Sequence, residues 1–199
     1  KLGLRSEALT LISVGRNHKK KNFKAIIDIA KILREQFNID FQFIIVGRGV
    51  SDLRKEVKKL NLEKYIFLIE EKKIKITKDL TLPSLSLIKL YKISDIFIFP
   101  SIIETFGVVI IEAMAAGLPV IAHKVEGSKD LVKNNHNGFL IENDSNNIKN
   151  FVDKIIKLSK EKLKIQMSQN CIHSAVKFDW VLIADKYIKL YQKIISRKI

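Results

Sequence analysis

Residues 99–120 have the sequence FPSIIETFGVVIIEAMAAGLPV, which contains the end of one strand, a helix and the beginning of a second strand. Pro100 ends the apolar run before it, because proline cannot continue a central strand. Residues 107–116 form an apolar segment of helical length, and Gly117 marks its end. The short run at 119–122 supplies the second strand. A strand, a helix and a strand in this order predict a βαβ unit with two parallel strands.

The same alternation continues on both sides of this unit. Further apolar runs predict strands at 11–15, 41–46, 65–69, 95–99 and 138–141. Helical periodicity is found at 22–36, 52–60, 84–93, 128–133 and 146–158, and two more helices follow. This alternation predicts an α/β fold with a mostly parallel sheet. Ligands of such sheets bind beyond the carboxyl ends of the strands. The candidate sites are therefore the loops after Val14, Val46, Ile69, Phe99 and Ala122.

Two segments stand apart from this pattern. The segment 70–83 is polar and rich in lysine, so we predict an exposed loop. The last helix carries one apolar stripe, formed by Val181, Ala184, Tyr187, Ile188, Tyr191 and Ile195.

Length and composition favour one globular unit. The chain has 199 residues, of which 47% are apolar, enough for a packed core. Cys171 is the only cysteine, so an internal disulfide is excluded and a reducing, cytoplasmic setting is favoured. We expect no signal peptide, and Lys1 in place of methionine indicates a fragment or a trimmed chain. The apolar run at 106–122 is interrupted by a glutamate, a glycine and a proline, which favours helix, turn and strand over a membrane span.

The net charge of +15 allows three interpretations. The lysines can simply cover the outer faces of helices. They can instead attract the chain to an anionic membrane surface or an anionic substrate. Nucleic-acid binding is the weakest interpretation, because no basic run is interleaved with stacking aromatic residues.

Two glycine turns follow the first two predicted strands. Gly15 and Arg16 precede a lysine cluster that ends at Lys21, and this loop leads into a helix. Backbone N–H groups at a helix N-terminus together with basic side chains suit a phosphate, although a solvated basic loop explains the same pattern. Gly47 and Gly49 allow close approach of a ligand to the backbone, or simply form a tight turn.

Two carboxylates lie in the segment 99–120. Glu104 is in the loop after a strand, and Glu112 lies inside an apolar helix. A carboxylate among apolar side chains is costly to bury without partners, so Glu112 either binds ligand hydroxyls or reaches solvent or a lysine. The helix N-terminus at 105–108 offers free N–H groups to an anion.

These motifs together resemble one known family. The pattern Pro-Ser-x-x-Glu-x-Phe-Gly-(x)4-Glu-Ala-Met-Ala-x-Gly-x-Pro-Val is similar to the signature of the family 4 glycosyltransferases, also called group 1, and Glu104 and Glu112 match its E-x7-E motif. The loop from Gly15 to Lys21, the Val-Gly-x-Gly turn at 46–49, the segment 126–130, Asn-Gly-x-Leu at 137–140 and Phe-Asp-Trp at 178–180 resemble further family motifs. The sequence departs from them at Asn22, Glu126 and Asp130, where the family commonly has Gly, Gly and Glu.

The resemblance implies a GT-B fold of two Rossmann-like domains. Residues 1–199 resemble the C-terminal half, a three-layer domain that binds the donor nucleotide, without the N-terminal half that holds most of the acceptor site. It further implies that Arg16 and Lys21 bind the donor diphosphate, that Glu104 contacts the donor sugar, and that these three residues are catalytic. Glu112 would bind the ribose hydroxyls. The remaining implied binding residues are Gly15, Gly47, Ile69, Thr105, Phe106, Gly107 and Val108.

The activity implied by the resemblance is transfer of a sugar with retention, from a UDP- or GDP-sugar to a glycan or lipid-linked acceptor. No Asp-x-Asp pair is present, so we expect no metal and no further cofactor. We expect a cytoplasmic protein, either free or peripheral on the inner membrane face, and no nucleic-acid partner. The alternatives are a non-catalytic nucleotide-binding module and another GT-B enzyme, such as a glycogen-synthase-like transferase or a sugar-nucleotide epimerase.

Overall fold

A computed structural model describes residues 3–71 and 83–196 of the chain. Its centre is a six-stranded sheet in which every strand pair is parallel. The strands are β1 Leu9–Val14, β2 Phe41–Gly47, β3 Ile66–Glu70, β4 Ile96–Phe99, β5 Val120–His123 and β6 Gly138–Ile141, in the order β3-β2-β1-β4-β5-β6. Most of the predicted loop 70–83 lies outside the described residues.

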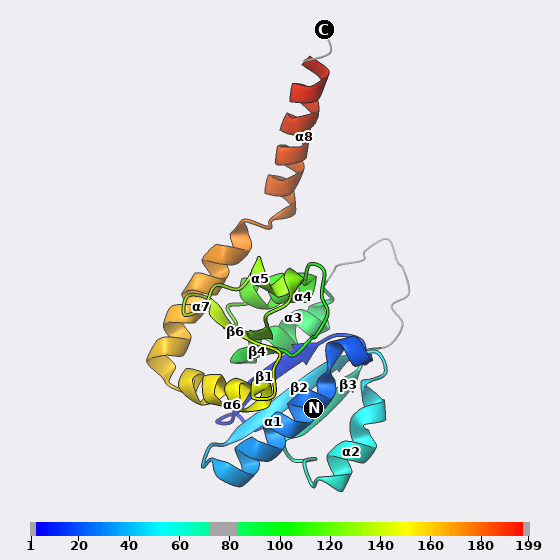
Figure 1. Cartoon of the computed structure of the whole chain (residues 1–199), viewed down its shortest axis with the longest axis vertical. Coiled ribbons are helices and arrows are strands. Elements are labelled where there is room, and N and C mark those ends of the chain that lie inside the picture. The colour runs from blue at the N-terminus through cyan, green and yellow to red at the C-terminus, as the bar shows by residue number, and fades with distance from the viewer. Residues whose placement is uncertain (1–2, 72–82, 197–199) are drawn as a thin grey trace.

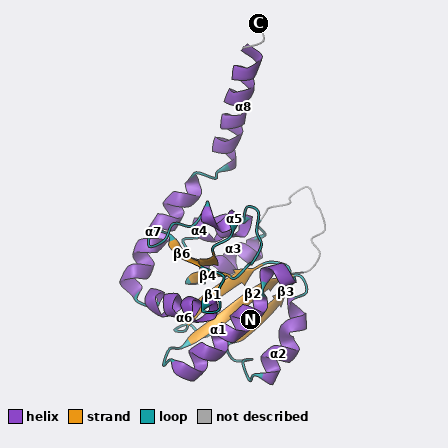
Figure 2. Ribbon diagram, in the orientation of Figure 1, coloured by secondary structure: helices purple, strands orange, loops and turns teal. Residues whose placement is uncertain are grey.

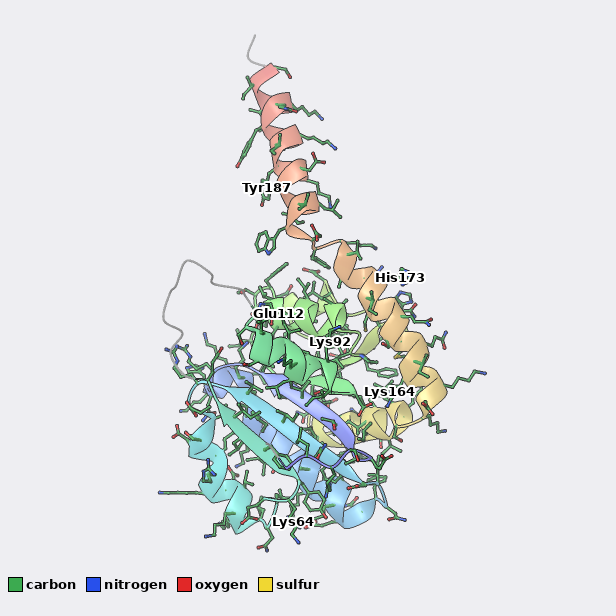
Figure 3. The ribbon with its side chains drawn as sticks, turned by 180° about the vertical axis from the view of Figure 1, so that it is seen from behind. Lys64, Lys92, Glu112, Lys164, His173 and Tyr187 are labelled. Carbon is green, nitrogen blue, oxygen red and sulfur yellow. The ribbon has the colours of Figure 1, made fainter. Side chains whose placement is uncertain are left out.

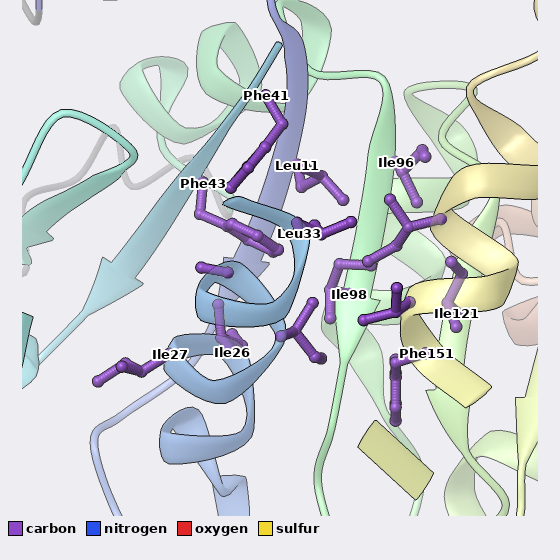
Figure 4. Packing of buried hydrophobic residues seen from close by; sticks show 14 of the residues in the cluster. Leu11, Ile26, Ile27, Leu33, Phe41, Phe43, Ile96, Ile98, Ile121 and Phe151 are labelled. Atoms are coloured by element: carbon purple, nitrogen blue, oxygen red, sulfur yellow. The ribbon is translucent and has the colours of Figure 1, made fainter. Parts of the chain in front are cut away.

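Helices cover both faces of the sheet (Figure 2). One core joins the sheet to α1 Phe23–Gln36, α2 Arg54–Lys59 and α6 Asn147–Leu158 (Figure 4). The second core joins it to α3 Leu85–Lys92 and α4 Val108–Ala115. Helix α7, Glu161–Val176, reaches both, because Met167 belongs to the first core and Cys171 to the second. Strands buried on both faces must be almost continuously apolar, which is why the sequence shows them as short apolar runs. The predicted three-layer α/β fold is confirmed.

Several element boundaries differ from the sequence prediction. The predicted helix 52–60 is divided into a 3-10 turn, η2 Val50–Leu53, and α2. A second 3-10 turn, η1 Lys19–Lys21, precedes α1 and was not predicted. Helix α5 spans Glu126–Lys129 rather than 128–133. It begins early because the Val125 N–H donates to Ser128 Oγ at 2.9 Å and so starts the turn across Gly127, a residue with poor helix propensity.

Helix α8, Trp180–Ser196, extends away from the rest of the structure (Figure 1). None of its residues is buried, and Trp180 is 82% exposed. The predicted apolar stripe is therefore formed but is not covered within the part of the chain that the structure describes. No helix among residues 3–71 and 83–196 is both long enough and apolar enough to cross a membrane.

The strand order reverses direction between β1 and β4. From β1 the chain adds β2 and then β3 on one side, and then crosses to add β4, β5 and β6 on the other. The loops that follow β1 and β4 therefore leave neighbouring strands and diverge towards opposite faces. In open parallel sheets, this switch point is where ligands bind.

Candidate functional site

The loops after β1 and β4 are joined at the switch point by two hydrogen bonds to one backbone carbonyl. The carbonyl oxygen of Lys20 accepts hydrogen bonds from Ser101 Oγ at 3.0 Å and from the Ile102 N–H at 2.9 Å. Asn22 ends the first loop in the left-handed conformation, with φ 50° and ψ 43°. Glycine and asparagine are the residues that adopt this conformation most readily, which explains the departure from glycine at this position.

Lys21 and Glu104 form an ion pair between these two loops. Lys21 Nζ lies 2.5 Å from Glu104 Oε2, and the two side chains are 24% and 16% exposed. Lys21 Nζ also lies 5.0 Å from the centre of the Phe99 ring. Burial raises the pKa of the Glu104 carboxyl, but the hydrogen bond and charge of Lys21 and the N–H groups of Thr105 and Phe106 outweigh burial, so the pKa is lowered. Glu104 is therefore ionised at neutral pH.

The segment between Glu104 and α4 presents the beginning of a helix to solvent. Gly107 adopts φ 87°, a left-handed conformation that favours glycine, and α4 begins at Val108 without a side-chain cap. The Thr105 N–H donates to Glu104 Oε1 at 3.1 Å, so this predicted donor is already in use. Phe106 and Val108 are 49% and 55% exposed, which leaves an apolar surface beside the ion pair.

Glu112 is half-buried on α4 (Figure 3). Its Oε2 accepts a hydrogen bond of 3.0 Å from the hydroxyl of Tyr91, a buried residue of α3. Burial raises the pKa of the Glu112 carboxyl, the bond from Tyr91 acts in the opposite direction, and the charge of Glu71 raises it further, so the pKa is raised. Within the described residues the side chain therefore bonds a phenol, not the lysine that was one of the sequence alternatives.

The two glycine turns pack against each other. A Cβ on Gly47 would lie 1.8 Å from the carbonyl oxygen of Gly15, so this close backbone approach requires glycine whatever else the turn does. The carboxylate of Glu70 accepts from the N–H groups of Gly49 at 2.5 Å and Ser51 at 3.0 Å, and these bonds lower its pKa. Two N–H groups of the second turn therefore already donate hydrogen bonds to the Glu70 carboxylate.

The other predicted site residues lie at the same edge of the sheet. Arg16 is exposed in the loop after β1, and Ile69 near the end of β3 pairs in register with Val46 of β2. The site roles of Arg16, Gly15, Gly47 and Ile69 stay predictions.

Gly127 was not predicted to contribute to the site, although it lies within a quoted family motif. Its N–H donates to the carbonyl oxygen of Glu104 at 2.9 Å. A Cβ at this position would lie 2.7 Å from the Phe106 nitrogen and 2.8 Å from Glu104 Cγ. Gly127 therefore allows α5 to support the 104–106 loop from behind.

We expect Gly127→Ala to displace the 104–106 loop. Because the methyl group would overlap backbone atoms of that loop, the variant should lose about 1–3 kcal/mol of stability. A thermal unfolding curve should show a Tm lower by several degrees, and backbone amide NMR shifts should change around Glu104. Lys129→Ala in the same short helix removes only an exposed ion pair with Glu126, and should alter neither measurement. Unchanged amide shifts around Glu104 in Gly127→Ala would contradict this role.

The two other departures from the family pattern are placed without strain. Glu126 has 83% of its side chain exposed and pairs with Lys129 at 2.6 Å, and Asp130 is the exposed residue that ends α5. Glu126 has no positive φ, so glycine is not required there.

Ser101 and Tyr91 contact the site, although neither was predicted to do so. Ser101 lies inside the quoted motif, whereas no feature of the sequence around Tyr91 distinguishes it from an ordinary core residue.

The chain is similar to known glycosyltransferases. A family model described as "Glycosyl transferases group 1" matches residues 1–178. An Escherichia coli protein named UDP-Gal:alpha-D-GlcNAc-diphosphoundecaprenol alpha-1,3-galactosyltransferase is 32% identical over 99% of this chain and 49% of its own length. A Campylobacter jejuni N,N'-diacetylbacillosaminyl-diphospho-undecaprenol alpha-1,3-N-acetylgalactosaminyltransferase is 32% identical over 55% of the chain and 29% of its own length.

Solved structures share the fold. Sucrose-phosphate synthase from Thermosynechococcus elongatus matches with a TM-score of 0.78 and 22% identity, over 98% of this chain and 48% of its own. An Anabaena protein crystallised with UDP-glucose matches with a TM-score of 0.77 and 22% identity, over 94% and 49%. The chain thus spans about half the length of these two proteins. The family model covers most of the sequence, and the parallel sheet and the order of the motifs agree with it. The chain therefore belongs to the group 1 glycosyltransferases.

Proposed function

We propose that this chain provides the donor-binding half of a retaining glycosyltransferase, which moves a hexose-like sugar from a nucleoside diphosphate to a glycan or lipid-linked acceptor. The observation that carries the proposal is the Lys21–Glu104 ion pair at the switch point of the sheet. The residues to which the resemblance assigns the diphosphate and the sugar are 83 positions apart in sequence and in direct contact. A relative named for UDP-Gal and a similar structure in complex with UDP-glucose support a nucleotide sugar as donor.

In the proposed reaction, the bond between the sugar and the diphosphate breaks, and negative charge develops on the leaving diphosphate. Fixed positive charge at that position stabilises the transition state. Lys21 has three N–H donors, so it can bind a phosphate oxygen while it keeps its bond to Glu104. Arg16 and the uncapped N-terminus of α4 add favourable interactions with the same charge.

Glu104 orients the sugar in this proposal and does not attack it. Its carboxylate is held by Lys21 and by the Thr105 N–H, so its position is fixed before the donor binds. An ionised carboxylate accepts hydrogen bonds from sugar hydroxyls and stabilises positive charge on the sugar ring. Glu112 accepts hydrogen bonds from the ribose hydroxyls. The backbone at 105–108, in which the Thr105 N–H already bonds Glu104, holds sugar and phosphate through its remaining N–H groups, with no metal and no further cofactor.

The acceptor and the location are further parts of the proposal. Relatives named for diphosphoundecaprenol substrates support a lipid-linked acceptor in polysaccharide or lipopolysaccharide synthesis. A cytoplasmic enzyme with a charge of +15 would be attracted to an anionic inner leaflet. The acceptor half is needed for transfer, so we propose that these 199 residues alone bind donor without transferring sugar.

Three alternatives make different predictions. A non-catalytic nucleotide-binding module would bind nucleotide but show no turnover with a complete acceptor half. A glycogen-synthase-like enzyme or a sugar-nucleotide epimerase would share the donor site and differ in the other half of the protein. A nucleic-acid binder would show affinity for DNA or RNA that falls steeply with salt.

Thermal unfolding with UDP, GDP, ADP and CMP tests the proposal. A ligand at about a hundred times its dissociation constant stabilises by about 2.7 kcal/mol. For a domain of this size this corresponds to a Tm increase of roughly 5–10 °C. We expect one diphosphate, UDP or GDP, to produce this shift. If no nucleotide shifts the transition at millimolar concentration, the isolated half does not bind donor and the proposal fails for this chain.

A further inference from the structure

Tyr91 connects the core of the protein to the site. Its ring is buried against Phe97, with ring centres 6.1 Å apart, and its hydroxyl bonds Glu112 Oε2 at 3.0 Å. Tyr91 lies on α3 and Glu112 on α4, so this bond joins two helices on one face of the sheet. A phenol inside an apolar core must find an acceptor, and here the acceptor is the carboxylate of the E-x7-E motif.

Glu112 lies in surroundings that oppose its ionisation. Ala113 and Met114 beside it on α4 are buried, and Glu71 after β3 adds a second negative charge. Tyr91 is the group that acts in the opposite direction. Helix α7, which packs on α4, brings the thiol of Cys171 to this core, and burial raises its pKa to about 12, so it stays neutral. The bond from Tyr91 therefore favours the ionised form of Glu112.

We propose that Tyr91 is a positioning residue of the donor site: its hydroxyl holds one carboxylate oxygen of Glu112, so that the other is directed to the ribose. The inference rests on the proposed function of Glu112. Only Oε2 is bonded among the residues that the structure describes, so Oε1 is available to a ligand.

A phenol suits this role better than a cation. A lysine would neutralise Glu112 and use its charge inside the protein, whereas tyrosine fixes the carboxylate and leaves its negative charge for hydroxyl donors. Burial and the nearby charge of Glu112 raise the pKa of Tyr91, so its hydroxyl keeps its proton and donates throughout the neutral range.

Tyr91→Phe removes the hydroxyl and keeps the ring, so it tests the inference with little disturbance of the core. The pKa of Glu112 can be measured in the free chain by NMR titration of carboxyl-labelled glutamate. We expect it to be higher in Tyr91→Phe than in the unchanged chain, because burial and Glu71 are then unopposed. Tyr65→Phe is the matched control on another element, where the ring stacks on Phe41, and it should leave the Glu112 titration unchanged.

Binding of UDP, measured by calorimetry as a function of pH, gives the second result. We expect Tyr91→Phe to weaken UDP binding by about 3–10-fold, with a larger loss towards acid pH, because a protonated Glu112 is a poorer acceptor for ribose. Adding Tyr91→Phe to Glu112→Gln should cause no pH-dependent loss. An unchanged Glu112 titration, or UDP binding equal to that of the unchanged chain at every pH, overturns the role of Tyr91. If Glu112→Gln alone leaves UDP binding unchanged, the proposed function of Glu112 is wrong and the inference fails with it.

Discussion

Glu112→Gln is expected to weaken UDP binding by about ten- to a hundredfold without loss of folding stability. A hydrogen bond to a charged group contributes about 1.5–3 kcal/mol, and glutamine keeps the size of the side chain but loses the charge. The effect on stability has the opposite sign. Burial raises the pKa of Glu112, so its ionised form opposes folding once the pH rises through that raised value. Glutamine removes this unfavourable contribution, so the Tm at pH 8 should be equal or higher.

The measurement is calorimetric titration with UDP together with thermal unfolding at pH 8. Glu63→Gln is the matched control, since Glu63 is exposed in the turn before β3, at the opposite end of that strand from the site. Equal UDP affinity in the two variants would contradict the ribose role of Glu112. A large decrease of Tm in Glu112→Gln would mean that Glu112 is a structural residue.

Lys21→Ala should weaken both nucleotide binding and folding. It removes a positive charge from the proposed diphosphate site and leaves the carboxylate of Glu104 without its partner. Breaking a buried ion pair costs about 3–5 kcal/mol. Because these side chains are 24% and 16% exposed, solvent screening reduces this to about 1–3 kcal/mol. The Tm should fall by roughly 2–10 °C, and the UDP-induced shift should disappear.

The pH dependence of this loss has a defined sign. Lys21 lowers the pKa of Glu104, so the pair stabilises the fold above the ordinary pKa of a carboxyl, and this contribution disappears as the pH falls through the lowered value. The difference in Tm between the unchanged chain and Lys21→Ala should therefore be largest near neutral pH and shrink on acidification. A difference that is constant with pH would show that the charge of Lys21 is not the cause.

Two further variants separate stability from binding. Glu104→Gln combined with Lys21→Ala removes the unpaired carboxylate, so it should recover part of the Tm but none of the UDP binding. Lys20→Ala is the neighbouring control, because Lys20 contributes its backbone carbonyl and not its side chain to the contact between the loops. If Lys20→Ala lost as much nucleotide binding as Lys21→Ala, a general attraction by the basic loop would explain the result.

The order and type of most elements could be predicted from the sequence because each depends on neighbouring residues. The strands are short apolar runs since both faces of the sheet are covered, and α1 and α6 have apolar residues at helical spacing. Helix propensity failed at α5, where a hydrogen bond within the turn decided the outcome. The Gly127 position predicts poor helix formation, yet α5 crosses it because Ser128 and Val125 form the turn.

The apolar stripe of α8 shows the same limit in another way. Periodicity predicts that a helix has an apolar face, and α8 has one, but periodicity does not say what covers that face. In the described residues the stripe is exposed, with Tyr187 and Ile188 at 57% and 53%. Burial is a property of the surroundings, so the sequence of one helix does not determine it.

The sequence alone predicted a parallel α/β protein in which Lys21 and Glu104 lie in loops after strands and Glu112 lies within the following helix. These are consequences of local composition and of motif spacing. Only the tertiary structure brought Lys21 within 2.5 Å of Glu104, placed the hydroxyl of Tyr91 on Glu112 and set Gly127 against the 104–106 loop. Such contacts join residues on different elements, and their energies depend on distance, burial and orientation, which a linear chain does not contain until the sheet has formed.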